Sequence, residues 1–121
     1  LIDELGPEKF KQIESESVLD LVGNQHVIAP GGSFIYSLDV INLIKDRTLF
    51  ILLHDNPINI KNRINNIDTR GIIGMENNSF EEIFYQRQDL YQNVCDLRFN
   101  LEFQSFKSVC NNIISYLDLL I

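Results

Sequence analysis

The chain has 121 residues, of which 45% are hydrophobic and 22% are charged. This length suits one compact domain, and the composition is typical of a globular protein, which excludes an intrinsically disordered chain. The formal net charge is −7 and Lys and Arg form no cluster larger than two residues, so a nucleic-acid or anionic-membrane surface is disfavoured. The longest apolar run, Leu49–Leu53, is too short to span a bilayer.

Hydrophobic spacing and turn residues predict that the first half of the chain alternates helices with strands. A helix over about residues 7–22 begins with a proline, which suits a first helical position. A short apolar strand follows at residues 27–29. Ser37 then caps a helix over residues 37–44. The continuous apolar run at residues 48–53 is typical of a strand that is covered on both faces.

The second half continues the alternation. A helix over about residues 56–66 leads into a polar, glycine-bearing stretch at residues 68–78, which is longer than a normal connection and resembles a lid. A helix over residues 79–94, an alternating strand at 97–103 and a strongly periodic helix at 106–120 complete the chain. Strands that alternate with helices favour parallel pairing in a layered α/β fold.

The two cysteines, Cys95 and Cys110, lie in apolar helical patterns without a CxxC motif or a nearby histidine. We interpret both as buried, reduced core thiols of a cytoplasmic protein. Two isolated thiols do not complete a tetrahedral zinc site, so no metal ligands are predicted in this chain.

The predicted helix at 79–94 carries a charged residue within its apolar face. Arg87 lies in the middle of the stripe formed by Phe80, Ile83, Phe84, Leu90, Tyr91 and Val94. A guanidinium cannot lose its charge, so its burial requires a carboxylate or phosphate, supplied by the protein or by a ligand. An internal ion pair, or a side chain that extends outward to solvent, is the structural alternative.

Three other features each have a functional and a plain structural interpretation. The Gly31-Gly32 pair follows a predicted strand, where glycines let a backbone approach a ligand, but an ordinary turn needs them equally. Arg63 and Arg70 flank the start of the predicted lid, where arginines suit phosphate neutralisation, although a solvated helix end favours the same residues. Lys11 is by default a surface lysine.

Four motifs, in order along essentially the whole chain, resemble those of the shikimate kinase family. The segment GPEKFKQIE at residues 6–14 resembles the GExxFRxxE helix, and IAPGGS at residues 28–33 resembles the strand and GGG turn. IDTRGII at residues 67–73 resembles the lid opening RPLL, and QRQDLY at residues 86–91 resembles ERxPLY. The resemblance implies one α/β domain over residues 1–121, with the three-layer, parallel-sheet fold of P-loop NTPases related to nucleoside-monophosphate kinases, incomplete at its N-terminus.

The resemblance also implies an activity and a substrate site. The complete enzyme would use ATP to phosphorylate the 3-hydroxyl of shikimate in aromatic amino-acid (chorismate) biosynthesis, as a cytoplasmic monomer with neither a nucleic-acid nor a membrane partner. Arg87 would bind the shikimate carboxylate, and Gly31 and Gly32 would contact its hydroxyls through the backbone. Lys11 stands where the family has a shikimate-binding arginine, and a lysine lacks the planar fork that grips a carboxylate at two points.

For the nucleotide, the resemblance implies ATP with Mg²⁺. Arg70 would be the catalytic lid arginine that reaches the ATP phosphates, and Arg63 would lie near the nucleotide. The Mg²⁺ ligands are expected in a segment that precedes this chain.

Departures from the family pattern are also present. Ser33 replaces the third glycine of the turn, Gly71 the lid proline, and Asp89 the proline of the last motif. No GxxxxGK[ST] motif occurs in the chain, so it contains neither a phosphate cradle nor the hydroxyl that binds magnesium. Because this motif precedes the first helix in the family and the chain begins with Leu1, we expect the C-terminal two-thirds of the domain, without a central strand of its sheet.

Two other functions stay open. The absent phosphate cradle, together with the departures at Lys11, Ser33 and Asp89, fits a catalytically inactive shikimate-kinase-like protein that serves in binding or regulation. A small P-loop kinase for another polyol acid, such as gluconate, is the second alternative, although Arg87 followed by Leu90-Tyr91 favours shikimate.

Overall fold

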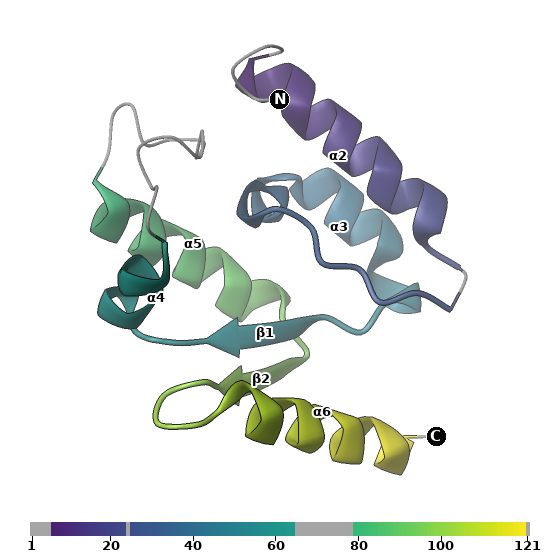
Figure 1. The fold of residues 1–121 in the computed structure, drawn as a ribbon. Coiled ribbons are helices and arrows are strands. Elements are labelled where there is room, and N and C mark those ends of the chain that lie inside the picture. The colour runs from purple at the N-terminus through teal and green to yellow at the C-terminus, as the bar shows by residue number, and fades with distance from the viewer. Residues whose placement is uncertain (1–5, 24, 65–78, 121) are drawn as a thin grey trace.

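The computed structural model describes residues 6–23, 25–64 and 79–120, which form helices around a small parallel sheet (Figure 1). The elements in chain order are α2 (Pro7–Leu21), the 3-10 helix η1 (Gly32–Tyr36), α3 (Leu38–Ile44), the 3-10 helix η2 (Lys45–Arg47), β1 (Ile51–His54), α4 (Pro57–Arg63), α5 (Phe80–Val94), β2 (Leu97–Asn100) and α6 (Phe106–Leu120).

The helices begin where their local sequence dictates. Pro7 occupies the first turn of α2, and the Ser79 side chain accepts a hydrogen bond from the Glu82 amide at the start of α5. Ser37 precedes α3 as predicted but makes no side-chain cap; its hydroxyl instead accepts from Ser15 of α2 at 3.1 Å. Helix α4 ends at Arg63, earlier than residue 66, because the backbone is already extended at the next residue.

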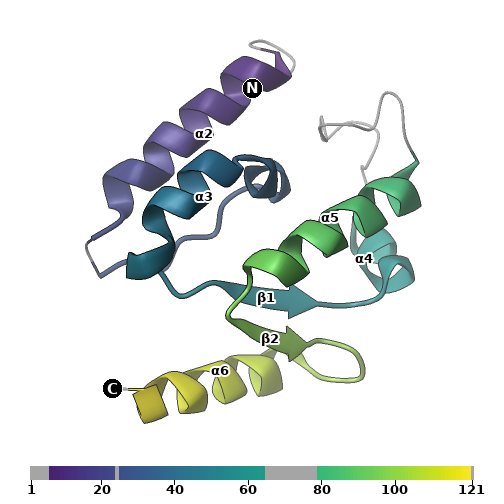
Figure 2. The same cartoon turned by 180° about the vertical axis from the view of Figure 1, so that it is seen from behind.

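The core lies between α2, η1 and α3, which lie side by side in both views (Figures 1 and 2). Its buried members are Val18, Phe34, Ile35, Val40, Ile41 and Ile44. Leu90, Tyr91 and Val94 pack against this cluster from α5. The apolar stripe predicted for α5 is therefore confirmed where the helix meets η1.

β1 and β2 pair in parallel, with Leu53 opposite Phe99. Phe99 packs edge-on against Tyr116 of α6 at 6.3 Å between ring centroids. Since side chains alternate across a strand, α6 covers the face opposite to the one on which Leu52 is buried. Helices thus lie on both faces of the parallel pair, as expected for the layered α/β class.

The strand predictions need correction. Residues 27–29 form no strand, because nothing in the described part of the chain pairs with them, and Val27 is fully exposed. β1 begins at Ile51, later than residue 48, and its Leu53 is 52% exposed, so the face of β1 that carries Leu53 is only partly covered. The second strand stops at Asn100 rather than continuing to Phe103, whose φ of 60° lies in the left-handed region and places it in a turn.

The predicted lid at residues 68–78, together with Arg70, lies outside the described residues. Among the helices that the structure describes, none is both long and apolar enough to cross a membrane.

Asn56 connects α4 to the segment after β2. Its side-chain oxygen accepts from the Asn59 amide at 2.8 Å, which caps α4. Its side-chain nitrogen donates to Glu102 Oε1 at 2.6 Å, 46 residues away in sequence. The same side chain therefore caps the N-terminus of α4 and fixes the loop that leads into α6.

We predict that Asn56→Ala lowers the free energy of unfolding by about 2 kcal/mol, since it removes both the cap and the charge-assisted bond to Glu102. Asn56→Ser keeps a cap acceptor and should recover about half of that loss. Urea denaturation of the variants checks this. Ser79→Ala, which removes a cap alone, is the matched control, and an equal loss for Asn56→Ala and Ser79→Ala would contradict the bridging role.

Candidate functional site

The Gly31-Gly32 turn is held from α2 and from its own continuation. The Gly31 amide donates to Glu14 Oε2 at 2.7 Å, and the Ser33 hydroxyl lies 3.4 Å from Glu14 Oε1. The two residues after Ser33 are buried in the core, which anchors the far end of the turn. Ser33, where the family pattern has glycine, is thus buried against a carboxylate of α2.

Arg87 lies directly against this turn. A Cβ atom on Gly32 would come within 2.5 Å of Arg87 Nη1, so any other residue here would push the guanidinium away from the turn. Tyr91, one turn further along α5, donates its hydroxyl to the Gly32 carbonyl at 3.2 Å. Burial raises the pKa of Tyr91, and this outweighs the positive charge of Arg87, which lowers it. The hydroxyl therefore stays protonated and able to donate.

Two cations, Arg87 and Lys11, lie close to the ring of Tyr36 at the end of η1. The Arg87 guanidinium lies 5.5 Å from the centre of the Tyr36 ring, and the Lys11 ammonium lies 6.0 Å from it. Arg87 Nε also donates to the Tyr36 hydroxyl at 3.4 Å. Lys11 pairs with Glu8 at 3.4 Å across one turn of α2. Two positive groups that share one ring create a site where an anion is stabilised.

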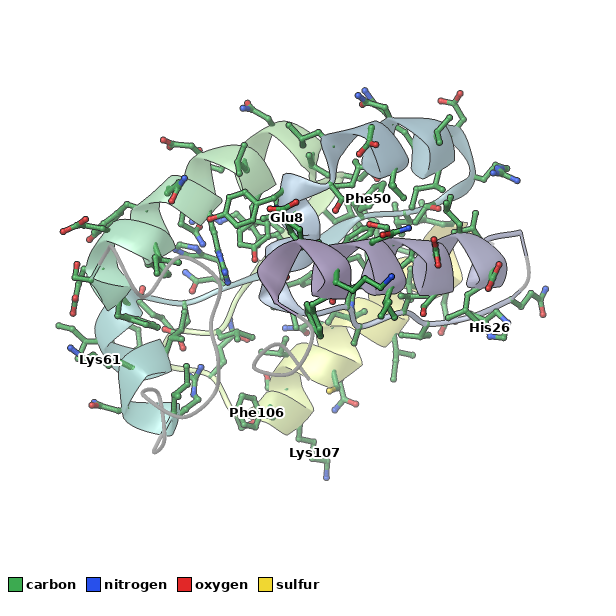
Figure 3. The ribbon with its side chains drawn as sticks, turned by 90° about the horizontal axis from the view of Figure 1, so that it is seen from above. Glu8, His26, Phe50, Lys61, Phe106 and Lys107 are labelled. Carbon is green, nitrogen blue, oxygen red and sulfur yellow. The ribbon has the colours of Figure 1, made fainter. Side chains whose placement is uncertain are left out.

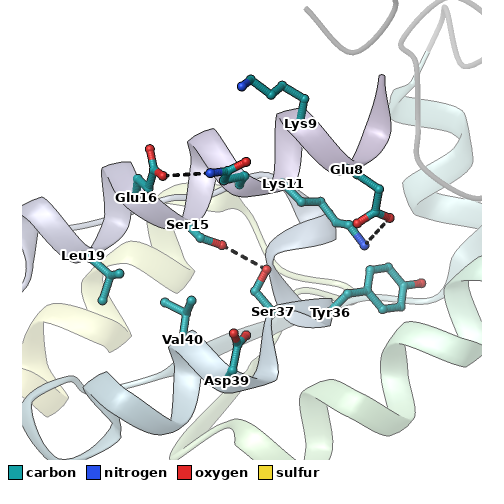
Figure 4. Close-up of a pocket in the computed structure, with 11 residues that line it drawn as sticks. Glu8, Lys9, Lys11, Ser15, Glu16, Leu19, Tyr36, Ser37, Asp39 and Val40 are labelled. Atoms are coloured by element: carbon teal, nitrogen blue, oxygen red, sulfur yellow. Dashed lines mark hydrogen bonds and ion pairs between the residues drawn. The ribbon is translucent and has the colours of Figure 1, made fainter. Parts of the chain in front are cut away.

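An open groove runs from this cluster along α2 and α3, with Lys11 and Tyr36 at one end (Figure 4). Leu19 and Val40 lie at the other end, and the Ser15–Ser37 hydrogen bond crosses between the two helices. Acidic, basic and apolar side chains all line the groove, so its charge does not select one class of ligand.

Arg63 belongs to a second group of residues, at the end of α4. Its guanidinium pairs with Asp55, the first residue after β1, and lies 5.4 Å from the centre of the Phe106 ring. Phe106, at the start of α6, faces α4 (Figure 3). Arg63 is 42% exposed, whereas Asp55 is 1% exposed, so the ion pair is buried mainly on the acidic side.

Asp55 stays charged despite its burial. Desolvation alone would raise its pKa, but hydrogen bonds from Asn59, Arg63 and the Asn56 amide, together with the charge of Arg63, hold the pKa below its ordinary value. The bonds from the Asn56 amide and the Asn59 side chain measure 2.7 and 2.9 Å. A buried carboxylate with this many donors positions its arginine rather than reacting itself.

The structure brings together four of the residues singled out from sequence. Gly31, Gly32 and Arg87 meet at the turn, and Lys11 reaches the same cluster through the Tyr36 ring. Arg87 is half-buried, and its contacts include the turn, the Tyr36 ring and the Tyr36 hydroxyl.

Three residues of this cluster had no predicted role. Glu14 and Tyr91 lie inside the motifs quoted above, so their position was available although their contacts were not. Nothing in the sequence indicated a role for Tyr36, because the residues around it come from helices that are distant in sequence.

The structure corrects one of the two cysteine predictions. Cys95 is half-buried, but Cys110 is exposed on α6, so the prediction of two buried thiols is wrong for Cys110. Within the described ranges, no three His, Cys, Asp or Glu side chains are grouped so that they could hold a metal ion.

Comparison with known families gives one match. The model of the shikimate kinase family matches residues 1–118 of this chain. No curated protein and no solved structure matches the chain significantly.

We predict that Asp55→Asn lowers the free energy of unfolding by about 2 kcal/mol at pH 7, because Arg63 loses its buried counter-charge. The folded-state pKa lies below the unfolded one, so the stabilisation is complete above about pH 4 and is lost as the pH falls further. The difference between wild type and variant in urea denaturation should therefore shrink below about pH 4.

Glu81→Gln is the matched control for this experiment, because Glu81 pairs with Lys61 at 3.2 Å on the exposed surface. It should change stability little at any pH. A loss for Asp55→Asn that stays constant down to pH 2 would contradict the charged pair.

Proposed function

Since the chain belongs to the shikimate kinase family, we propose that it forms the shikimate-binding and lid-bearing part of an enzyme that transfers the γ-phosphoryl group of ATP to the 3-hydroxyl of shikimate. The observation that carries the proposal is the convergence of Lys11 and Arg87 on Tyr36 beside the Gly31-Gly32 turn. Shikimate is a cyclic polyol with one carboxylate. It therefore needs a cationic pocket at one end and hydrogen-bonding backbone at the other.

Arg87 is proposed to bind the shikimate carboxylate. Its guanidinium is held at a fixed place by the bare Cα of Gly32 and by the Tyr36 hydroxyl, so little side-chain freedom is lost when a ligand binds. Lys11 supplies a second positive charge from α2, although as a point charge without a fork. The Gly31 amide is already bonded to Glu14, so the exposed turn offers the hydroxyls its carbonyl oxygens, each of which can accept a second hydrogen bond.

The nucleotide half of the proposal rests on Arg63 and on Arg70, which lies outside the described residues. Arg63 is fixed by Asp55 and packs on the exposed ring of Phe106, which supports a role at a nucleotide rather than a freely solvated helix end. The residues in this chain do not fit Mg²⁺ or a phosphate cradle, because the sequence has no GxxxxGK[ST] and the described side chains form no metal-binding group. No phosphoryl-transfer step is therefore assigned to them.

The absent phosphate cradle also supports a second candidate, a binding or regulatory protein that retains the shikimate site without catalysis. The coding sequence upstream of Leu1 separates the two. An in-frame GxxxxGK[ST] followed by an Asp-bearing strand supports the kinase, and ADP release from the protein of the complete reading frame, with ATP, Mg²⁺ and shikimate, tests it directly. A start codon or a stop in place of that segment supports the binding protein.

We predict that Arg87→Ala in the protein of the complete reading frame weakens shikimate binding by about 30-fold or more, since a charged hydrogen-bonding partner of the carboxylate is lost. ATP binding should change less than about twofold. Calorimetric titration with each ligand measures both. Arg47→Ala, at an exposed arginine beyond the far end of α3, is the control. Equal weakening of both ligands by Arg87→Ala would contradict the carboxylate role.

Arg70→Ala should have the complementary effect. An arginine that neutralises the transferring phosphate acts in the transition state, so kcat should fall by about 100-fold or more while shikimate affinity stays nearly constant. Steady-state kinetics, with shikimate and ATP varied in turn, check this. If the main effect is on shikimate affinity, the assignment of Arg70 to the phosphates is wrong.

A further inference from the structure

Tyr36 lies outside the four motifs, yet the fold places it in the cluster with Lys11 and Arg87. It follows two buried residues of η1, Phe34 and Ile35, which hold the 3-10 turn in the core and so fix the direction of the next side chain. The ring of Tyr36 is half-buried and packs against that core. Its position is therefore determined by the fold rather than by solvent.

The hydroxyl oxygen of Tyr36 is a hydrogen-bond acceptor in this cluster. Arginine has donors and no acceptor, so Arg87 Nε must donate to the Tyr36 oxygen and leaves the tyrosine proton unused. The neighbouring hydroxyl of Tyr91 donates its proton to the Gly32 carbonyl. Among the described residues, no acceptor for the Tyr36 proton lies within hydrogen-bonding distance. A hydroxyl that accepts from a guanidinium becomes a better donor itself, since hydrogen bonds in a chain polarise one another.

Two cations flank the same ring, as described above, and both are proposed to meet the substrate carboxylate. Arg87 Nε already lies 3.4 Å from the Tyr36 oxygen, so a carboxylate bound to the same guanidinium would lie close to the Tyr36 hydroxyl. Lys11 cannot make the two-point contact that an arginine makes, so a carboxylate at this site lacks a donor that a further hydroxyl would supply.

We propose that Tyr36 is a third carboxylate-binding residue of this site, whose hydroxyl donates to the substrate carboxylate while its ring contacts both Lys11 and Arg87. The proposal rests on the shikimate-binding function proposed above and adds a specificity-determining residue to it. Tyr36 selects an anionic group over a neutral one, because its proton is directed to an acceptor that two positive charges hold in place.

The test is the affinity of the protein of the complete reading frame for shikimate and for its hydroxymethyl analogue, in which the carboxylate is replaced by a neutral group. Tyr36→Phe keeps the ring and removes the donor, so shikimate should bind about tenfold more weakly while the analogue is unaffected. Tyr85→Phe, on the exposed side of α5, is the matched control and should change neither affinity. Tyr36→Leu also removes the ring and should weaken shikimate binding further.

The outcomes separate this inference from the proposed function. If wild type binds no shikimate, the proposed function fails and the role of Tyr36 fails with it. If wild type binds shikimate and Tyr36→Phe binds it equally well, the role of Tyr36 alone is overturned. Equal weakening for shikimate and the neutral analogue also overturns it, because that result indicates a general change in the shape of the site. A circular dichroism spectrum and melting temperature equal to those of wild type ensure that Tyr36→Phe is compared as a folded protein.

Discussion

The position of Arg87 constrains the rest of the cluster around the Gly31-Gly32 turn. A guanidinium within the apolar face of α5 stays charged at any physiological pH, so its surroundings must be built to receive it. Nη1 occupies the space that a Cβ of residue 32 would take, so a side chain there would displace the guanidinium. The Tyr36 ring lies beside the guanidinium, and Tyr91 holds the backbone of the turn against the helix. The charge of Arg87 thus bears on the residues at both ends of η1.

Arg63 presents the contrasting case. Its charge is compensated within the chain, because Asp55 is buried at the end of β1 and receives donors from the start of α4 as well as from the guanidinium. A pair of this kind restricts the arginine to one orientation without using up all of its donors. The guanidinium of Arg63 also lies against the Phe106 ring, so an anion and an aromatic face both hold it in place. The two arginines therefore differ in setting: Arg63 is fixed by a buried carboxylate, whereas Arg87 lies against a glycine turn and a tyrosine.

The helices could be predicted from the sequence because their determinants are local: a proline or a serine at the start and apolar residues at helical spacing. The strands could not be predicted in this way, because a strand forms only where its backbone pairs with a neighbouring strand. Val27 belongs to an apolar run, yet it is exposed and unpaired within the described residues. Arg87 was identifiable as a misplaced charge in a regular pattern. Tyr36 and Glu14 were not, because their roles arise from contacts between elements that are distant in sequence.

Three departures from the family pattern lie among the described residues. Ser33, in place of a glycine, is buried beside Glu14, which also holds the amide of Gly31. Asp89, in place of a proline, lets α5 continue from Phe80 to Val94 with its amide available to the helix. The lysine at position 11 shares an aromatic ring with Arg87. The side chains at positions 11 and 33 thus contact other elements of the fold, and the one at position 89 leaves a helix uninterrupted. The fold accommodates all three departures without a break in its helices or its core.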